Sequence, residues 1–374
     1  MALLRFPVRQ FWLACGLFAV CASAQAENWP DKDWVSAPAP ASAALDALEQ
    51  YAFPLRDEKE RKGVRTDALV VIRDGVLVYE RYAEPTNAQT AHLTWSMSKS
   101  LWATVMGVAY GQGLFRLDAP VAQYYPAFAE HPQIKMGHLF NWASGLDWQE
   151  DYEYAPLKSS VVAMLYTRGR SDMAAFTAAH KAGAEAGTRF RYSSGDSNVL
   201  AATMKQIVGE QAYADYPWKA LFEPLGITSA TWERDPSGTY IASSYAYLTA
   251  RDLARVGLLM QRDGRWRDQQ LLPKAWVEFN RTPFANFVPQ ADKPNGAVAA
   301  GHWWVNKAVS SYPKPWPDVP DDVFLASGHW GQGLYVFPSQ NLVVVRYADD
   351  RDGSFDRNHF LKLVLAAMAT GEQP

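Results

Sequence analysis

The feature that most constrains the fold is a pair of strand–turn–strand patterns, one near each end of the chain. Residues 68–72 and 76–82 are rich in β-branched and apolar side chains and flank Asp74-Gly75, a dipeptide that suits the two-residue turn of a β-hairpin. Residues 334–347 repeat this arrangement, with a Pro-Ser-Gln-Asn turn between two apolar runs. The sequence therefore predicts a sheet to which both ends of the chain contribute, with the middle of the chain inserted between them.

Two predicted helices lie between these hairpins, and a third follows the second hairpin. Residues 96–110 are apolar at helical spacing and end at a glycine-rich stretch. Thr249 and Ser354 are placed to cap two further helices, over 250–261 and 355–369. Because helices are predicted before and after the inserted part, we expect them to pack against the sheet.

Together these patterns predict an α/β (α+β) fold, in which an antiparallel sheet is flanked by helices. A mainly helical lobe, about 115–245, is expected as the insertion, and residues 27–374 are expected to form a single domain. Residues 283–322 contain seven prolines and little periodicity. Such a stretch predicts a functional lid or an extended surface loop.

The first residues have the pattern of an export signal. Arg5 and Arg9 precede a short apolar stretch, 11–20, and an Ala-Gln-Ala sequence then fits the rule for signal-peptide cleavage. We expect residues 1–26 to be a signal peptide and the protein to be exported, to the periplasm or out of the cell. The apolar stretch is too short for a comfortable membrane span, and no integral span is expected after cleavage. A retained N-terminal anchor is the alternative.

Composition argues against several kinds of chemistry. Cys15 and Cys21 both lie inside the export segment, so the processed protein would have no disulfide, thiolate nucleophile or cysteine-bound metal. The seven histidines form no His-x-x-x-His pattern, and no glycine-rich phosphate loop is present. We therefore expect no metal and no organic cofactor. The net charge of −3 gives no indication of a nucleic-acid partner.

Ser96 and Lys99 form a Ser-x-x-Lys pattern at the start of a predicted helix. A serine hydroxyl is a poor nucleophile unless a base accepts its proton, and residues three apart on a helix share a face. A partly desolvated lysine can act as that base. The same spacing occurs at Ser311 and Lys314, where two prolines argue against a helix. The pattern alone is therefore weak.

Tyr192 is the second candidate, because a tyrosine can relay a proton if a nearby cation lowers its pKa from about 10. Of the 18 tyrosines, it alone is followed at the second position by Ser or Asn, here Ser194. The alternative is an ordinary loop residue before a helix. The third candidate is the sequence His329-Trp330-Gly331, which leads into a predicted strand. A glycine at a strand edge admits a substrate backbone, and main-chain N–H groups there can bind an oxyanion.

The three motifs in this order resemble those of the serine β-lactamase and penicillin-binding superfamily, specifically its class C-like branch. That branch carries Ser-x-x-Lys, then Tyr-x-Asn or Tyr-x-Ser, then Lys-Thr-Gly or His-x-Gly. Further matches lie at 139–146, 221–226 and 252–255, and the resemblance runs from about residue 65 to residue 365. It implies a β-lactamase/transpeptidase-like fold.

The resemblance also implies a role for each motif. Ser96 would be the acylated nucleophile, with Lys99 and Tyr192 sharing proton transfer. The backbone N–H groups of Ser96 and Gln332 would form the oxyanion hole. The substrate-binding residues would be Ser194, His329, Trp330 and Gly331.

Departures from the family pattern narrow the expected activity. Ser194 and His329 replace the Asn and Lys typical of efficient class C β-lactamases. The chain looks closer to family esterases and to hydrolases of 6-aminohexanoate oligomers, in which an extra tyrosine of the cleft assists amide cleavage. Tyr152 is the candidate counterpart, against the alternative of an aromatic residue in a surface loop.

We therefore expect a secreted serine hydrolase that cleaves ester or amide bonds of a small molecule or short peptide. A D-Ala-D-Ala carboxypeptidase and a weak class C-like β-lactamase are the alternative enzymes. The alternative of another class is a catalytically dead, penicillin-binding-like receptor or scaffold.

Overall fold

The computed structural model describes residues 27–289, 297–310 and 312–369 of the chain. The predicted signal peptide, with both cysteines, lies outside the described residues. Among the described helices, none combines the length and the apolar character that a membrane span needs.

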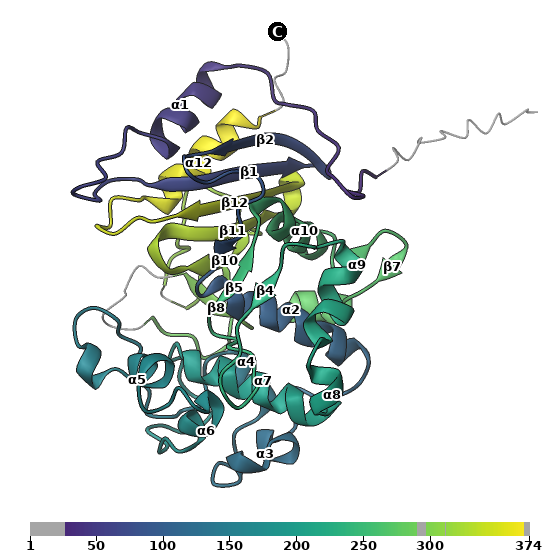
Figure 1. Cartoon of the computed structure of the whole chain (residues 1–374), viewed down its shortest axis with the longest axis vertical. Helices are drawn as coiled ribbons and strands as arrows, with labels where there is room; N and C mark the ends of the chain where they lie inside the picture. The colour runs from purple at the N-terminus through teal and green to yellow at the C-terminus, as the bar shows by residue number, and fades with distance from the viewer. Residues whose placement is uncertain (1–26, 290–296, 311, 370–374) are drawn as a thin grey trace, which may run out of the picture.

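A seven-stranded sheet in the order β2-β1-β12-β11-β10-β9-β8 forms the upper part of the molecule, and each pair of neighbours is antiparallel (Figure 1). Strand β1 from near the N-terminus pairs with β12 from near the C-terminus, so the predicted sheet from both chain ends is confirmed. Its strands are β1 (Thr66–Arg73), β2 (Val76–Tyr82), β8 (Val298–Ala300), β9 (Trp303–Val305), β10 (Phe324–Gly328), β11 (Gln332–Phe337) and β12 (Leu342–Ala348).

The turn between β1 and β2 explains why this hairpin could be predicted from the sequence. Asp74 and Gly75 both have positive φ, of 49° and 77°, as a type I′ turn requires. A Cβ atom at Gly75 would also lie 2.1 Å from the carbonyl oxygen of Asn28. Glycine therefore meets a conformational and a steric requirement at this position.

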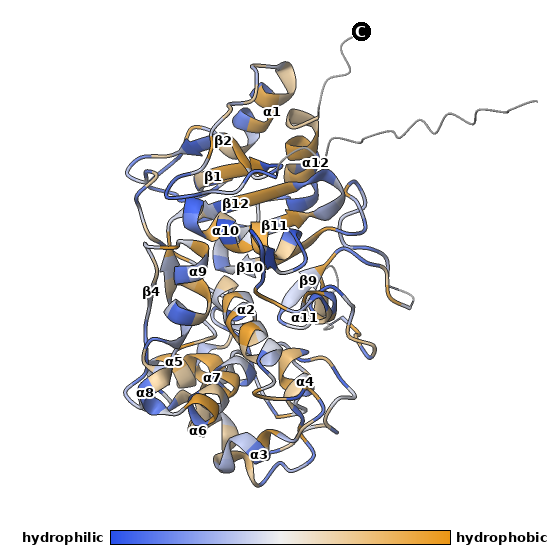
Figure 2. Ribbon diagram, turned by 90° about the vertical axis from the view of Figure 1, so that its right-hand side faces the viewer, coloured by the Kyte–Doolittle hydropathy of each residue, from blue (hydrophilic) through white to orange (hydrophobic). Residues whose placement is uncertain are grey.

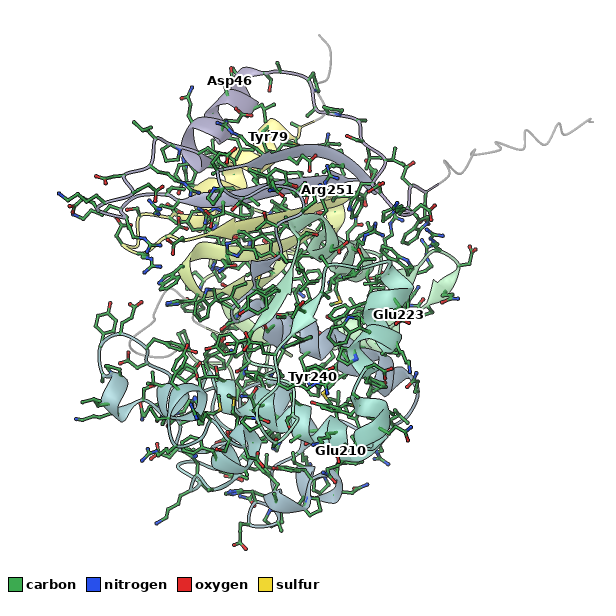
Figure 3. The ribbon with its side chains drawn as sticks, in the orientation of Figure 1. Asp46, Tyr79, Glu210, Glu223, Tyr240 and Arg251 are labelled. Carbon is green, nitrogen blue, oxygen red and sulfur yellow. The ribbon has the colours of Figure 1, made fainter. Side chains whose placement is uncertain are left out.

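The sheet is buried on both faces, which is why β1 is apolar along most of its length. Leu69 and Val71 face a cluster with helices α1 (Ala43–Ala52) and α12 (Arg357–Ala367). Val70 and Ile72 face the main core, to which α10 (Ala250–Gln261) and α2 (Met97–Gly111) contribute. The apolar strands and α12 are the orange ribbon in the upper part of Figure 2. Arg251 of α10, labelled in Figure 3, forms an ion pair with Glu80 of β2.

The two capped helices near the sheet agree with the predictions to different degrees. Helix α10 has the predicted bounds, and its cap Thr249 accepts a hydrogen bond from the Asp252 N–H. Helix α12 is shorter than the predicted 355–369, because Asp356 rather than Ser354 caps it. Asp and Ser are both good caps, so the sequence did not distinguish them.

Below the sheet the chain is mainly helical between residues 121 and 225, with α7 central and surrounded by α4 and α6 (Figure 1). The helices are α3 (Val121–Tyr124), α4 (Met136–Phe140), α5 (Ser160–Tyr166), α6 (Met173–Ala178), α7 (Ser194–Val208), α8 (Glu210–Tyr213) and α9 (Glu223–Leu225), with short 3₁₀ and π turns between them. Three smaller pieces complete the fold: the sheet of β3 (His92–Leu93), β5 (Ala246–Leu248) and β4 (Thr231–Trp232), the pair β6 (Arg265–Trp266) and β7 (Gln269–Gln270), and α11 (Lys274–Phe279).

The prediction of an irregular lid or loop over 283–322 is wrong for part of that stretch. Residues 298–300 and 303–305 form β8 and β9 at the edge of the main sheet. These strands have three residues each and are mostly buried, so they show no alternation in the sequence.

Candidate active site

Ser96 lies at the turn that opens α2, and its side chain lines a cavity of about 600 Å³. Trp95 before it has a φ of 46°, an uncommon conformation for a non-glycine residue. The turn is held by the Met97 N–H, which donates to the Thr94 carbonyl oxygen over 3.1 Å. Ser96 is half-buried and open to the cavity. A hydroxyl in this position is accessible to a bound substrate.

Lys99 lies one helical turn further, as the spacing predicts. Its Nζ donates hydrogen bonds to Ser96 Oγ over 3.0 Å and to the Ser243 carbonyl oxygen over 2.8 Å. The side chain is only 1% exposed. Burial disfavours the ammonium form and lowers the pKa of Lys99 to about 8, although the nearby negative charge of Glu150 opposes this. Lys99 can therefore lose its proton near neutral pH.

Tyr192 is the third residue of this group. Its ring centroid lies 4.9 Å from Lys99 Nζ, and its hydroxyl lies close to the Ser96 side chain. Trp142 and Trp304 pack against the ring, with centroid distances of 4.9 Å and 5.6 Å. The fold thus brings Tyr192 from a distant part of the chain to the pair formed by Ser96 and Lys99.

The expectation that a nearby cation lowers the pKa of Tyr192 is wrong. Burial and then the negative charge of Glu150 raise that pKa, and together they outweigh the lowering influence of the nearby Ser96 side chain. Tyr192 is therefore a neutral phenol at neutral pH. Tyr192 can donate its proton only while it accepts another one. Its own charge then stays the same, and Lys99 is the group whose charge changes.

Glu150 is a functional candidate that the sequence analysis missed. Its carboxylate lines the cavity and accepts hydrogen bonds from Trp148 Nε1 and from both the N–H and the hydroxyl of Ser194. A single glutamate in a loop matches no pattern, so nothing in the sequence distinguished it. Its charge raises the pKa values of Lys99 and Tyr192.

Ser194 has a different environment from the one expected. It is the first residue of α7, is fully buried and is not among the residues that line the cavity. Its hydroxyl donates to Glu150. The geometry therefore places Ser194 behind Glu150, where it holds that carboxylate in the cavity wall.

Tyr152 lies on the segment 149–154, which we call the strap and which lines the cavity. Its side chain lies near that of Ser194, and its ring centroid is 5.7 Å from that of His329. Burial and the charge of Glu150 raise the pKa of Tyr152 well above its usual range. The structure thus places Tyr152 in the cleft rather than on an outer loop.

The motif His329-Trp330-Gly331 forms a tight turn between β10 and β11, and it leads directly into the strand β11, as predicted. Trp330 has a φ of 59° and Gly331 a φ of 82°. His329 lines the cavity, but Trp330 packs under Arg351, whose Cζ is 3.8 Å from the ring centroid. A Cβ at Gly331 would lie 1.9 Å from Asp350 Oδ2. Of this motif, only His329 reaches the cavity.

Gln332 is fully buried and does not line the cavity. With its amide oriented to satisfy both groups, Gln332 donates to the Leu93 carbonyl oxygen over 2.7 Å and accepts from Trp95 Nε1 over 3.3 Å. The hairpin residues that do line the cavity are Ser327, Gly328 and His329. Through these two hydrogen bonds, the side chain of Gln332 stabilises the turn that precedes Ser96.

Gly328 brings this hairpin into contact with the nucleophile turn. A Cβ atom on Gly328 would lie 2.5 Å from the Thr94 carbonyl oxygen and 3.4 Å from Trp95 Cβ. Its φ of −120° is ordinary, so the close approach alone requires glycine. The end of β10 is thereby fixed beside Ser96.

Charged side chains are unevenly distributed around the cavity. Glu150, Asp151 and Glu153 come from the strap, whereas Arg191 precedes Tyr192, and Arg357 comes from the start of α12 and contacts Ser327. Glu153 also lies close to the hairpin, with its Oε1 3.5 Å from His329 Nε2. Among the described residues, no group of three or more His, Cys, Asp or Glu side chains is arranged to hold a metal ion.

Comparison with known proteins agrees with this geometry. A family model described as Beta-lactamase matches residues 48–367. The 6-aminohexanoate-dimer hydrolase of Paenarthrobacter ureafaciens is 29% identical over 325 residues, which cover 83% of this chain and 78% of that protein. A solved structure from Bacillus anthracis, described as a candidate 6-aminohexanoate-dimer hydrolase, aligns with a TM-score of 0.68 at 20% identity and covers 91% of this chain and 88% of its own. A family VIII carboxylesterase aligns with a TM-score of 0.64 at 16% identity, covering 87% and 97%.

Proposed function

Because the chain belongs to the beta-lactamase family, we propose that it is a serine hydrolase that cleaves ester or amide bonds through an acyl-enzyme on Ser96. The hydrogen bond of 3.0 Å between Lys99 Nζ and Ser96 Oγ carries this proposal. It joins a base whose pKa is lowered by burial to a hydroxyl that lines a cavity. A nucleophile within hydrogen-bond reach of its base is the arrangement that covalent catalysis needs.

In the acylation step, neutral Lys99 accepts the proton of Ser96 while Oγ attacks the carbonyl carbon of the substrate. The tetrahedral intermediate collapses when the bond to the leaving oxygen or nitrogen breaks. The leaving group takes up the proton from Lys99, with the Tyr192 hydroxyl as the relay between them. Lys99 is then neutral again, and Ser96 carries the acyl group.

In the deacylation step, water replaces the leaving group and the same residues act in the opposite direction. A water molecule gives its proton to Lys99, through Tyr192, and attacks the acyl carbon. Ser96 Oγ leaves and recovers the proton. The products are the free acid and the regenerated enzyme, and no cofactor takes part in these steps.

Oxyanion stabilisation in this scheme comes from the backbone N–H of Ser96 and a second N–H of the β10–β11 hairpin. The sequence pointed to Gln332 for the second donor. We keep the backbone N–H of Gln332 as the second donor, since Gln332 pairs with Gly328, and Gly328 lines the cavity together with Ser327 and His329. Removing one such donor typically costs about 10²–10³ in rate.

Short linear esters and amides are the substrates that we propose. The curated relative acts on 6-aminohexanoate dimer, a linear amide, and the same class of bond would fit a cavity with aromatic walls. Tyr152, near Ser194 and the cavity, is the candidate for the tyrosine that assists amide cleavage. We also propose export of the enzyme, on the basis of the leader pattern at residues 1–26.

A substrate panel tests this function. The panel contains a short-chain nitrophenyl ester, the 6-aminohexanoate dimer, a D-Ala-D-Ala peptide and a chromogenic cephalosporin. We expect turnover of the ester and the dimer, and loss of both in Ser96→Ala. A protein that hydrolyses none of the four, or that keeps its activity in Ser96→Ala, would contradict the proposal.

A further inference from the structure

Asn198 is a buried polar residue of α7 that takes no part in the catalytic steps described above. It lies one helical turn beyond Ser194, which holds Glu150, so the two side chains share a face of the helix. Asn198 is 1% exposed, and its Oδ1 accepts a hydrogen bond from the Ser243 N–H over 3.0 Å. A side-chain amide of α7 thus fixes a main-chain group in the turn that precedes β5.

Ser243 connects Asn198 to the catalytic lysine. The Ser243 carbonyl oxygen accepts a hydrogen bond from Lys99 Nζ over 2.8 Å. The N–H and the carbonyl group of Ser243 lie on either side of a single Cα atom, so fixing the N–H limits the positions that the carbonyl oxygen can take. All three residues are at most 1% exposed. Both hydrogen bonds are therefore shielded from water.

The surroundings of the Asn198 amide group are otherwise apolar. Its Nδ2 lies 3.4 Å from Met164 Sδ and 3.5 Å from Met173 Sδ, and a thioether sulfur is only a weak acceptor. Leucine has the same branching and the same number of side-chain heavy atoms as asparagine, and burying it there costs no polar group its water. The hydrogen bond with the Ser243 N–H is therefore what asparagine provides at this position and leucine does not.

The Ser243 carbonyl oxygen determines how the nitrogen of Lys99 faces the nucleophile. A neutral amine has two N–H bonds and one lone pair. When one N–H donates to the Ser243 oxygen, rotation about the last bond of the lysine side chain is restricted, and the lone pair can stay turned toward the hydroxyl proton of Ser96. A general base is effective only when it is both within reach and correctly oriented.

We propose that Asn198 is a positioning residue for catalysis, which fixes the Ser243 carbonyl oxygen so that this oxygen orients Lys99. The lone pair of Lys99 Nζ is thereby kept turned toward Ser96 Oγ. This role rests on the proposed hydrolase function and belongs to a side chain that does not line the cavity. Helix α7 then supports the site at two places, through Ser194 and, one turn further, through Asn198.

Three single variants test this role in stopped-flow acylation by a nitrophenyl ester. Asn198→Leu keeps the shape of the side chain and removes the acceptor. Its acylation rate constant at saturating ester should fall by roughly 10- to 100-fold, whereas the ester concentration for half-saturation should change little. Asn198→Asp keeps an acceptor oxygen and should recover most of the lost rate.

Asn306→Leu is the matched control. Asn306 is also fully buried, accepts the Trp316 N–H through its Oδ1 over 2.8 Å and does not line the cavity. This variant should lose stability in thermal unfolding and keep the wild-type acylation rate constant. The comparison separates the positioning of Lys99 from the general effect of removing a buried amide.

The state of Lys99 can also be followed without a substrate. In protein labelled with 13C-lysine, the Cε signal of Lys99 is identified by its absence in Lys99→Met, and titration of this signal gives the pKa. An ammonium group gains more from the Ser243 carbonyl oxygen than a neutral amine does. The pKa should therefore be lower in Asn198→Leu than in the wild type, no lower in Asn198→Asp and unchanged in Asn306→Leu.

The two measurements distinguish the positioning role from the hydrolase function. A wild-type acylation rate constant or an unchanged pKa of Lys99 in Asn198→Leu would overturn the inference, and so would equal effects of Asn198→Leu and Asn306→Leu. If the wild type hydrolyses no ester or amide, a shift of the Lys99 pKa that is specific to Asn198→Leu would support the positioning of Lys99 and contradict only the hydrolase function. The other titratable groups near Lys99 are left in place by all three variants: Glu150, Tyr192 and His302.

Discussion

Lys99 Nζ lies 3.0 Å from Ser96 Oγ, and the lysine side chain is almost completely buried in the first turn of α2. This relationship combines two effects that favour catalysis. The hydrogen bond gives the serine proton a direct acceptor, and burial brings the pKa of the acceptor down to about 8. A base with a pKa near the working pH is the most effective one.

The pH dependence of activity should follow the protonation of Lys99. Only the neutral amine can accept the serine proton, so kcat/KM for a neutral ester should rise as the pH increases through about 8. Glu150 holds the pKa of Lys99 up, so Glu150→Gln should move the midpoint of this rise to lower pH. Initial rates from pH 5 to 10 measure both.

Asp147→Asn is the control for this shift, because Asp147 is exposed and does not line the cavity. Its midpoint should coincide with that of the wild type. A midpoint in Glu150→Gln that is unchanged or higher would show that the carboxylate does not act on the catalytic lysine.

Lys99→Met should lower the acylation rate and raise the stability of the folded protein. Removal of the base should lower the single-turnover acylation rate by roughly 10⁴-fold, a typical cost for a member of a catalytic unit. The folded protein holds the proton of Lys99 more weakly than the unfolded chain does, since its pKa falls from 10.5 to about 8. A tenfold change in proton affinity corresponds to about 1.4 kcal/mol, so the variant should be more stable at pH 7 by about 2 kcal/mol after loss of the hydrogen bonds.

Because the pKa of Lys99 is lowered on folding, the difference in stability between the two proteins depends on pH. Between pH 8 and pH 10.5 the unfolded chain binds more protons at Lys99, so the stability of the wild type rises with pH there relative to Lys99→Met. Urea unfolding at pH 7 and pH 10 should show a smaller difference between the two proteins at pH 10. An advantage of the variant that grows with pH would be inconsistent with a buried lysine of lowered pKa.

Tyr192→Phe should keep the fold and slow the chemistry. The phenylalanine ring preserves the packing against Trp142 and Trp304, whereas the hydroxyl close to Ser96 is lost. Loss of a proton relay should reduce the single-turnover rate by about 10²–10⁴. Circular dichroism should be unchanged. An unaltered single-turnover rate would remove Tyr192 from the proton path.

Gly328→Ala should disturb the contact between the hairpin and the nucleophile turn. The added methyl group would lie 2.5 Å from the Thr94 carbonyl oxygen, a distance that forces a backbone shift. Overpacking of this kind typically costs 1–3 kcal/mol, roughly, and misplacement near the reaction can cost about 10²-fold in rate. The measurements are thermal unfolding and kcat. Gly353→Ala has open space around its Cβ position but a φ of 76°, so it should lose some stability through backbone strain and keep the wild-type kcat. An equal loss of kcat in both variants would refute the steric explanation.

The sheet could be predicted because its signals are local. Asp74-Gly75 determines a turn by its backbone conformation, and the apolar runs on both sides have the length of strands. Thr249 likewise indicated the start of α10 through a contact with its own first turn. Strands β8 and β9 could not be predicted, since they are three residues long, and their place in the sheet depends on the pairing of β9 with β10.

Some residues of the candidate site could likewise be predicted from local sequence, and others could not. Ser96 and Lys99 share one helical turn, so their contact follows from spacing. Tyr192 was found only through its order in the family pattern. Glu150 and Arg357 were missed because they reach the cavity from a loop and from the last helix, and only the folded chain brings them there. The tight turn at Trp330 likewise depends on a positive φ, which a tryptophan in the sequence does not indicate.

The most direct test of the central claim is intact-protein and peptide mass spectrometry after reaction with a fluorophosphonate probe. The account predicts one adduct per chain, located on Ser96, at a rate that falls sharply in Lys99→Met, and no adduct in Ser96→Ala. An unlabelled wild-type protein, or a label carried by a different serine, would contradict it.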